Sequence, residues 1–335
     1  LGYYYAPTMT SSNTQGMSYL QGGNPWSGMS NLYLVNDDLR WETTDTKNIG
    51  FDFGLFNNKL NGSINYYYNT TEDLLIEKVM APSAGIYNPT VNVGKMVNKG
   101  FELELNYGDN VNGFEYNVGL NLSTIKNEML KADPNQILYG SAWKGDGHAV
   151  TQTLKGYPVA GFWLYQADGL FQSDAEAAAY VNSKGERLQP NAYAGDVRFV
   201  DTNGDGSIDS SDKVYSGSGI PKVEANLSFS GAYKNFDLSF QFGSAWGHKL
   251  YNVNRLYYEG MDAGRNFFKT TLDAWTPQNT HTDMPRAVLN DLNQNTREST
   301  RFLENGNFVR LRQLQLGYSL SRTIAKKIYL EKCRL

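Results

Sequence analysis

Alternation of apolar and polar residues with a period of two is the feature of this sequence that most restricts its fold. In residues 101–107, Phe, Leu, Leu and Tyr take the odd positions, whereas Glu, Glu and Asn take the even ones. The same alternation appears in residues 49–55, 60–68, 114–122, 223–233 and 236–242. Successive side chains of a β-strand point to opposite faces, so each run predicts a strand with one apolar and one polar face.

The connections between these runs predict hairpins. The Asn- and Gly-rich segments 57–59 and 108–113, and the pair Lys234-Asn235, each join two alternating runs. Near the end of the chain, the alternation in residues 309–318 changes phase between Leu311 and Leu314. A β-bulge near Arg312 and Gln313 would explain this slip.

Much longer segments, 125–157, 166–221 and 247–300, separate the hairpins. Short turns at one end and long loops at the other, joined by strands of about 9 to 11 residues, are typical of outer-membrane barrels. Aromatic residues at strand ends, as in residues 66–68, fit interfacial girdles. The predicted fold class is all-β: an antiparallel transmembrane β-barrel portion, incomplete, with roughly 8 to 12 strands, short periplasmic turns and long extracellular loops. Alternation also occurs in a β-sandwich core, so that alternative stays open.

Composition excludes several classes of protein. The net charge of −4 provides no basic field for nucleic acid, and no stretch approaches 18 consecutive apolar residues, as a membrane-spanning helix requires. The single cysteine, Cys333, cannot form an internal disulfide. Because the chain starts at Leu1 without a signal peptide, we expect a fragment of a longer protein.

Three further segments carry local predictions. Residues 1–40 are expected to form a loop with one short strand, since they show no sustained period. Residues 173–181 begin with a potential N-cap serine and are Ala-rich, which predicts a helix. Residues 267–275, ended by Pro277, are expected to be helical as well.

Residues 201–212 have the spacing of a cation-binding loop. Acidic or amide residues take places one, three, five, nine and twelve, and a glycine at place six permits a sharp turn. This spacing predicts a structural Ca²⁺ site, or Mg²⁺ in its place, and the alternative is a turn that is merely rich in Asp, Asn and Gly. The predicted ligands are Asp201, Asn203, Asp205, Ser207, Asp209 and Asp212.

We find no motif for catalysis, so an enzyme is not expected. The three histidines lie far apart, and no nucleophile elbow, phosphate loop or dinucleotide fingerprint is present. Glu102 and Glu104 share a strand face and could imitate a glycosidase pair, but lumen-facing carboxylates are the simpler interpretation. Loop aromatics could stack on sugar rings or contact a partner, with buried anchors as the alternative: Trp143, Trp163, Trp246, Tyr257 and Tyr258.

Several motifs, taken in order, resemble the SusC/RagA family of TonB-linked outer-membrane proteins. The first is Leu-Arg-Trp-Glu-Thr-Thr at 39–44, followed by Asn-Ile-Gly-Phe-Asp-Phe-Gly-Leu-Phe at 48–56. The next are Asn-Val-Gly-Lys-Met-Val-Asn-Lys-Gly-Phe-Glu-Leu-Glu at 92–104 and Gly-Tyr-Pro-Val-Ala-Gly-Phe at 156–162. Then come the 201–212 loop and, at 301–312, Arg-Phe-Leu-Glu-Asn-Gly-Asn-Phe-Val-Arg-Leu-Arg.

The resemblance implies a TonB-dependent transporter in the outer membrane of a Gram-negative bacterium, in contact with lipid and lipopolysaccharide. Such proteins import oligosaccharides or peptides, and a SusD-like surface lipoprotein caps them. Residues 1–335 would be part of the barrel, without plug, early strands or last strands, and residues 166–221 an extracellular loop that holds the cation-binding segment. A soluble, calcium-stabilised β-sandwich for adhesion or glycan binding is the alternative. The expected lumen residues are Glu102, Glu104, Asn117, Asn121, Asn226, Asp237 and Gln241.

Overall fold

The computed structural model describes most of the chain. The described residues are 9–11, 18–22, 24–27, 29–31, 36, 38–81, 83, 88–133, 136–140, 149–262, 264, 266–327 and 329–335.

One large antiparallel sheet organises the described part of the chain. Its hydrogen-bonded order is β20-β17-β16-β8-β7-β6-β5, and β9 pairs with β7 beside this path. These eight strands fall within the range expected from the sequence, so the predicted all-β barrel portion is confirmed. The strands are β5 (Thr43–Leu55), β6 (Leu60–Glu77), β7 (Thr90–Val111), β8 (Phe114–Thr124), β9 (Lys126–Lys131), β16 (Val223–Tyr233), β17 (Phe236–Trp246) and β20 (Phe308–Tyr318).

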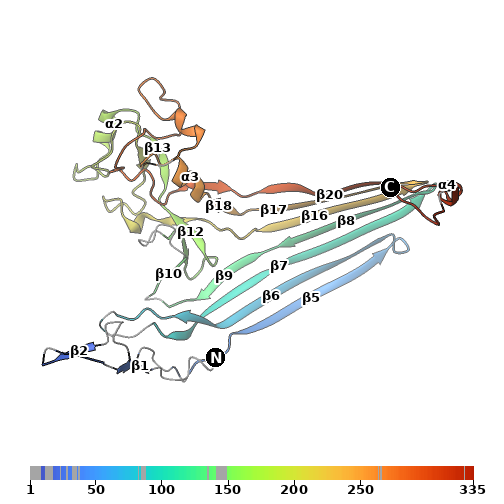
Figure 1. The fold of residues 1–335 in the computed structure, drawn as a ribbon, viewed down its shortest axis with the longest axis horizontal. Coiled ribbons are helices and arrows are strands. Elements are labelled where there is room, and N and C mark those ends of the chain that lie inside the picture. The colour runs from blue at the N-terminus through green and yellow to red at the C-terminus, as the bar shows by residue number, and fades with distance from the viewer. Residues whose placement is uncertain are drawn as a thin grey trace.

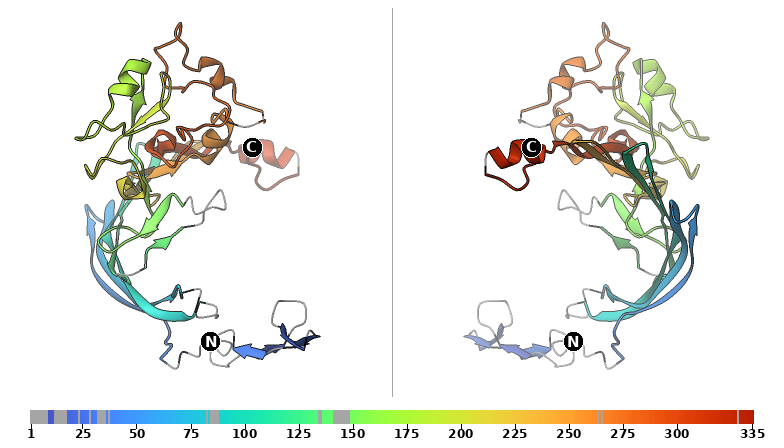
Figure 2. Two further views of the ribbon diagram at one scale, coloured as in Figure 1. Left: turned by 90° about the vertical axis from the view of Figure 1, so that its left-hand side faces the viewer. Right: turned by 90° about the vertical axis from the view of Figure 1, so that its right-hand side faces the viewer.

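The sheet is curved. Seen along the strands it forms an arc that stays open between the β5 side and the β20 side (Figure 2). The long strands therefore belong to one layer, and no second long-stranded sheet packs against them in the described part of the chain. The β-sandwich alternative is wrong for this reason, because a sandwich core needs two facing sheets.

Three tight turns close hairpins at the same end of the sheet (Figure 1). Leu55 pairs with Leu60, Val111 with Phe114, and Tyr233 with Phe236. Each turn contains residues in the left-handed region, where Asn and Gly are the residues best tolerated: φ is 55° at Asn57 and 81° at Gly113. The predicted hairpins are confirmed.

The lengths of the strands correct one expectation. β8, β16, β17 and β20 have 11 residues each, as predicted, but β6 has 18 and β7 has 22. The extra length is mixed in character: Asn69 pairs with Asn98 and Glu72 with Lys95, whereas Val97 and Met96 lie between them opposite two threonines. Because main-chain hydrogen bonds of a ladder do not require alternating side chains, these two strands continue beyond the alternating stretch that the sequence reveals.

The phase slip in β20 is a bulge, as predicted. Gln241 pairs with Gln313 and the next residue, Phe242, pairs with Leu311, which leaves Arg312 without a partner in the ladder. The extra residue restores Leu314 and Leu311 to the same face.

The loops gather at the end of the sheet opposite the tight turns (Figure 1). We call residues 138–140, 149–222 and 247–307 the loop layer. Its strands are β10 (Leu138–Tyr139), β11 (Thr151–Thr153), β12 (Gly161–Leu164), β13 (Ala167–Leu170), β14 (Val197–Phe199), β15 (Val214–Gly217), β18 (Lys249–Tyr251) and β19 (Leu303–Asn305). Its helices are α2 (Asp174–Ala179), η2 (Ser210–Asp212), α3 (Val253–Tyr258), η3 (Lys269–Asp273) and η4 (Thr300–Phe302).

The apolar core lies in the loop layer. One cluster contains Leu164 and Phe302, a second contains Phe199 and Trp275, and a third surrounds Phe171. Phe171, Phe199, Phe302 and Leu164 are fully buried. The loop layer thus has the close-packed interior that the single-layered sheet lacks.

The local helix predictions have mixed outcomes. α2 forms where expected, and the Ser173 side chain accepts a hydrogen bond from the Glu176 N–H as its N-cap. In residues 267–275 the structure has only the short 3₁₀ helix η3. The sequence did not reveal α3 or α4 (Arg322–Lys327).

The N-terminal segment forms more strand than the single one expected. Its described residues include β1 (Met9–Ser11), β2 (Ser18–Gln21), β3 (Asn24–Ser27) and β4 (Met29–Asn31), paired β1 with β4 and β2 with β3. Across the residues described, no helix has the length and apolar character to cross a membrane.

Candidate functional site: the polar face of the sheet and the loop layer

The two faces of the sheet differ in chemistry, as two neighbouring cross-strand rows show. One row pairs Phe51 with Ile64, Ile64 with Leu103, and Leu103 with Leu122. The next row is shifted by one residue and joins Asp52, Ser63, Glu104, Asn121 and Asn226. The strand period therefore separates an apolar face from a polar face across five neighbouring strands.

The apolar face is exposed rather than packed. Ile49 is 73% exposed, Phe51 66% and Leu316 71%. Contiguous apolar surface of this extent is not stable in water, so lipid is the environment that suits it. Other exposed members of this face are Leu55, Ile64, Phe101, Phe114, Leu227, Phe236, Leu238, Leu311 and Leu314.

The polar face is hollowed at two places. A cavity of about 240 Å³ brings together Glu102, Glu104, Asn121 and Asn226 with the further carboxylate Glu224. Four of the seven predicted lumen residues thus share one cavity, although they come from three strands. Glu224 was expected on the polar strand face but not among the lumen residues, and its partner across the strands is Ser123.

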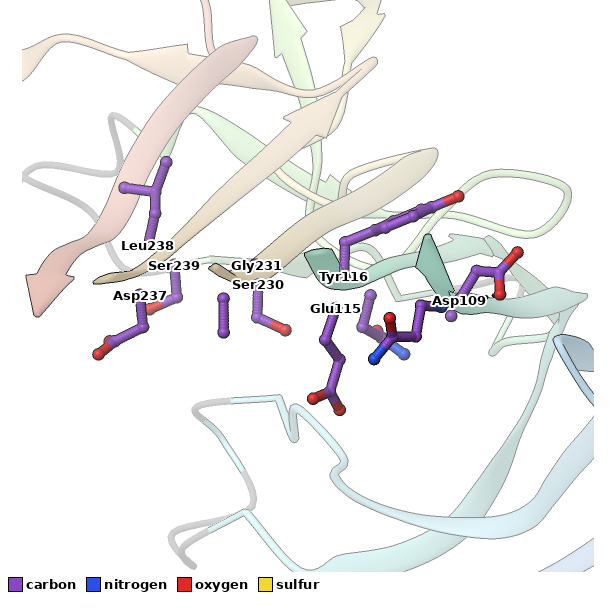
Figure 3. A pocket seen from close by; sticks show the side chains of 12 residues that line it. Asp109, Glu115, Tyr116, Ser230, Gly231, Asp237, Leu238 and Ser239 are labelled. Carbon is purple, nitrogen blue, oxygen red and sulfur yellow. Dashed lines mark hydrogen bonds between the residues drawn. The ribbon is translucent and has the colours of Figure 1, made fainter. Parts of the chain in front are cut away.

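A larger cavity of about 740 Å³ lies nearer the tight turns and contains two more predicted residues, Asn117 and Asp237. Figure 3 shows Glu115 and Asp237 pointing to one side of the sheet, whereas Leu238 points to the other. Arg334 approaches Asp237 from the C-terminal segment, with its Nε 2.9 Å from Asp237 Oδ2. The seventh residue, Gln241, pairs with Ser228 and Gln313 in the ladder.

The predicted aromatic contacts separate into different environments. Trp246 at the end of β17 is 43% exposed, and Tyr258 is 40% exposed and packs against the tilted ring of Phe268 with 4.9 Å between ring centroids. Trp163 packs instead against Tyr157, at 4.9 Å between centroids. Tyr257 is half-buried, and Trp143 lies outside the described residues.

Residues 201–212 form a loop held by its own main chain. Asp201 accepts hydrogen bonds from the N–H groups of Gly204 and Gly206 at 2.7 and 2.9 Å. Asp212 is fully buried and accepts from the N–H groups of Thr202 and Asp209. These bonds give the loop its shape whether or not an ion is bound.

The remaining predicted ligands are exposed or partly exposed. The Ser207 N–H donates to Asp205 Oδ1 at 2.9 Å, and this bond and one from Asn203 hold the pKa of the Asp205 carboxyl below its usual value. Asp209 accepts from the Ser211 N–H at 2.8 Å. Among the described residues, no group of three or more His, Cys, Asp or Glu side chains is placed to hold a metal ion. The cation site therefore stays a prediction, and binding would require these side chains to turn inward.

A buried polar network that the sequence prediction missed holds the loop layer together. Asp196 is fully buried, and its two oxygens lie 2.8 and 3.0 Å from Arg286 Nε and Nη2. Asn295 Nδ2 donates to Asp196 Oδ1 at 3.0 Å, and Asn295 Oδ1 accepts from the Val197 N–H at 2.8 Å. No sequence signal links these residues, because Arg286 and Asn295 lie 90 and 99 positions from Asp196.

A curved antiparallel sheet with an exposed apolar outer face and a hollowed polar inner face is the wall of a transmembrane β-barrel. Residues 2–163 match the sequence profile described as "TonB dependent receptor-like, beta-barrel". The chain is 30% identical to TonB-dependent receptor P3 of Formosa agariphila over 311 aligned residues. This alignment covers 90% of the chain and 29% of the receptor. It is 27% identical to TonB-dependent receptor SusC of Bacteroides thetaiotaomicron over 321 aligned residues. This alignment covers 92% of the chain and 29% of SusC.

Solved structures agree with these relatives. The RagAB peptide importer in its "closed-closed" state is 26% identical with a TM-score of 0.72, covering 99% of this chain and 34% of the other. Its "open-open" state, at 24% identity and a TM-score of 0.74, has the same fold. The chain belongs to the TonB-dependent receptor family, in its SusC/RagA branch. It spans 29% of the length of receptor P3 and of SusC.

Proposed function

We propose that this chain forms part of the barrel wall and outer loops of a TonB-dependent nutrient importer in the outer membrane of a Gram-negative bacterium. The observation that carries the proposal is the opposition of the two faces of one curved sheet. Phe51, Phe101 and Leu316 are exposed on the outside, whereas Glu102, Glu104 and Asn226 share a cavity on the inside. An apolar exterior and a polar interior are what a passage for a hydrophilic cargo across a membrane requires.

The cargo we propose is an oligosaccharide or a peptide. Carboxylates, amides and hydroxyls line both cavities of the polar face, and these groups form hydrogen bonds with the hydroxyls of a sugar or the amides of a peptide. RagAB, which shares the fold of this chain, is a peptide importer. Receptor P3 and SusC are named as receptors. We therefore propose transport, and no catalysed reaction, for this chain.

The loop layer is the part that we propose meets cargo and a SusD-like surface lipoprotein. Trp246 and Tyr258 are exposed enough for stacking on a sugar ring or on a protein partner. Trp163 is better described as a structural residue that holds the loop layer together, because it packs against both Tyr157 and Tyr215. Energy coupling through TonB is proposed from the names that the relatives carry.

We also propose that the 201–212 loop binds Ca²⁺, or Mg²⁺ in its place, in a structural role. Two observations support this proposal. The oxygen-bearing side chains have the spacing of a cation-binding loop. Asn203, Asp205 and Asp209 are exposed, and Asp201 is partly exposed. Each carboxylate oxygen that accepts one N–H still has a lone pair for a cation. Extracellular modules of this kind bind Ca²⁺ with dissociation constants of about 0.1 to 1 mM.

A transport assay tests the main proposal. A strain that lacks the full-length gene is complemented with the wild-type gene or with Phe101→Lys, and uptake of labelled oligosaccharides and peptides is measured. We expect uptake of one cargo class with the wild type, and loss of both uptake and outer-membrane protein with the variant. A full-length protein that is soluble without detergent would contradict the proposal.

A further inference from the structure

A third cavity lies within the loop layer, away from the polar face of the sheet. It measures about 290 Å³, and half of its lining residues are apolar or glycine: Ala167, Gly169 and Leu170 from β13, and Val197 from β14. Its polar groups are Arg255 from α3, Thr300 and Arg301 from η4, and Asp283. Small-molecule sites combine apolar walls with converging polar groups, and in this cavity the polar groups form the other half of the lining.

Arg301 is the unusual member of this cavity. Its side chain is only 9% exposed, yet its Nε and Nη1 atoms are buried without a hydrogen-bond partner. Its Nη2 lies 3.3 Å from the sulfur of Met284 and 3.9 Å from a Glu259 oxygen. A buried guanidinium normally has its N–H groups satisfied, since each one left unpaired costs its full desolvation free energy.

The neighbouring arginine shows what Arg301 lacks. Arg255 Nε lies 3.0 Å from Glu259 Oε2, and its Nη1 lies 3.3 Å from Glu304 Oε1. Glu259 also accepts a hydrogen bond from Thr270 Oγ1 at 3.1 Å, so this carboxylate is already engaged on two sides. Two further acids act on Arg301: Asp283, which is exposed and lines the cavity, and Asp291. Arg301 therefore has only a longer ion pair with Glu259, and two of its nitrogens have no hydrogen-bond acceptor.

The electrostatics agree with this geometry. Burial lowers the pKa of Arg301 to about 10, and the Glu259 carboxylate opposes that effect only in part. The side chain stays positively charged at neutral pH. An anionic oxygen entering the cavity would supply the missing acceptor and charge together, and charge-assisted bonds of this kind are the strongest that arginine forms.

We propose that the cavity between β13, β14, α3 and η4 binds a single carboxylate group, with Arg301 as its principal donor. Thr300 Oγ1 accepts from the Ala167 N–H at 3.0 Å and has its own hydroxyl proton to donate to a second ligand oxygen. The volume admits one residue of a polymer, such as a uronic acid or an acidic amino acid, and not an oligomer. The inference rests on the proposed importer function and deepens it, because it assigns an acidic group to the cargo.

Calorimetric titration of the purified full-length protein in detergent tests the proposal. The probes are glucuronate, N-acetylglutamate and, as a neutral control, methyl glucoside. Arg301→Gln removes the charge and the unpaired donors, and Ala167→Leu fills the cavity without changing the arginine. Arg198→Gln is the matched control, because Arg198 lies in the same layer but outside the cavity and pairs with Asp168 and Glu176 at 2.9 and 2.7 Å.

We expect at least one acid to bind the wild type and the Arg198 variant equally, and roughly 10- to 100-fold more weakly to the Arg301 and Ala167 variants. Binding of glucuronate alone identifies an acidic glycan, and binding of N-acetylglutamate alone identifies an acidic peptide. If the Arg301 variant does not fold, the Ala167 variant decides. The proposal is overturned if neither acid binds at about 10 mM, if methyl glucoside binds as tightly, or if the cavity variants bind like the wild type.

Uptake of a neutral cargo by the complemented strain separates this inference from the importer function. Uptake without carboxylate binding would overturn the carboxylate site alone. Absence of uptake of any cargo, in a strain with normal amounts of the protein, would count against the importer.

Discussion

The sheet and the loop layer are stabilised in different ways. The sheet is one layer thick, and residues such as Ile49 and Leu316 leave most of their surface uncovered. The loop layer has three apolar clusters and an ion pair between the buried Asp196 and the partly exposed Arg286. The wall therefore depends on its hydrogen-bond ladder and on lipid, whereas the loop layer folds around its own interior. Changes to the two regions should have separable consequences.

The largest expected effect is in the loop layer. Asp196→Ala leaves the Arg286 guanidinium and Asn295 without their buried acceptor, which should cost about 3 to 5 kcal/mol. We expect trypsin to cleave the loop layer rapidly while the sheet stays protected. Asp168→Ala is the matched control, because Asp168 is 64% exposed and its pair with Arg198 should be worth at most about 1 kcal/mol. Equal digestion of the two variants would contradict the division into two regions.

The next effect is in the wall. Phe101→Lys places a charge on the apolar face, which should cost about 2 to 4 kcal/mol near the middle of a bilayer. Asn106→Lys makes the same chemical change on the polar face of the same strand and should cost close to nothing. Unfolding titrations of full-length protein in lipid vesicles measure both values. Similar losses for both variants would show that the two faces are not in different environments.

A smaller and local effect is expected in the 201–212 loop. Asp201→Ala combined with Asp205→Ala should increase protease cleavage within the loop several-fold and leave the wall unchanged, because Asp201 accepts two main-chain N–H bonds there. Millimolar Ca²⁺ should protect the wild type and not the double variant. Equal sensitivity of the two proteins, with and without Ca²⁺, would end the cation proposal.

The smallest effect is a pH dependence of the same loop. Hydrogen bonds from Ser207 and Asn203 lower the pKa of Asp205, so the unfolded loop binds this proton more readily than the folded loop. The contribution of Asp205 is therefore complete above its usual pKa of 3.8 and is lost as the pH falls through the lowered value. Hydrogen exchange at Ser207 should stay constant, after correction for intrinsic rates, between pH 5 and 7 and rise in stronger acid. A change near pH 6 would contradict this assignment.

The wall could be predicted from the sequence because its signals are local. Alternation marks each strand, the turn residues Asn57 and Gly113 mark the hairpins, and the phase slip at Arg312 marks the bulge. A strand shows its two faces in its own residues, whatever its partner. The pairing of β16 with β8, across both of the long segments 125–157 and 166–221, had no such local signal.

The loop layer could not be predicted in the same way, because its contacts join distant positions. Asp196 meets Arg286, and Gln189 donates to Asn293 across 104 positions, with no periodicity to announce either pair. The extra lengths of β6 and β7 were missed for a related reason, since main-chain ladder hydrogen bonds do not require side chains that alternate with a period of two. Arg301 appeared only within a family motif, and its burial depends on Met284 and Glu259 from other segments.

The account is tested most directly by site-directed spin labelling along residues 101–106 of the full-length protein in lipid vesicles, with Cys333 replaced by serine. Each position carries one label, and its accessibility is measured to oxygen, which enters lipid, and to a water-soluble nickel complex. We predict that Phe101, Leu103 and Leu105 are accessible to oxygen, and that Glu102, Glu104 and Asn106 are accessible to nickel. Uniform accessibility to nickel along the strand would contradict a barrel wall with one face in lipid.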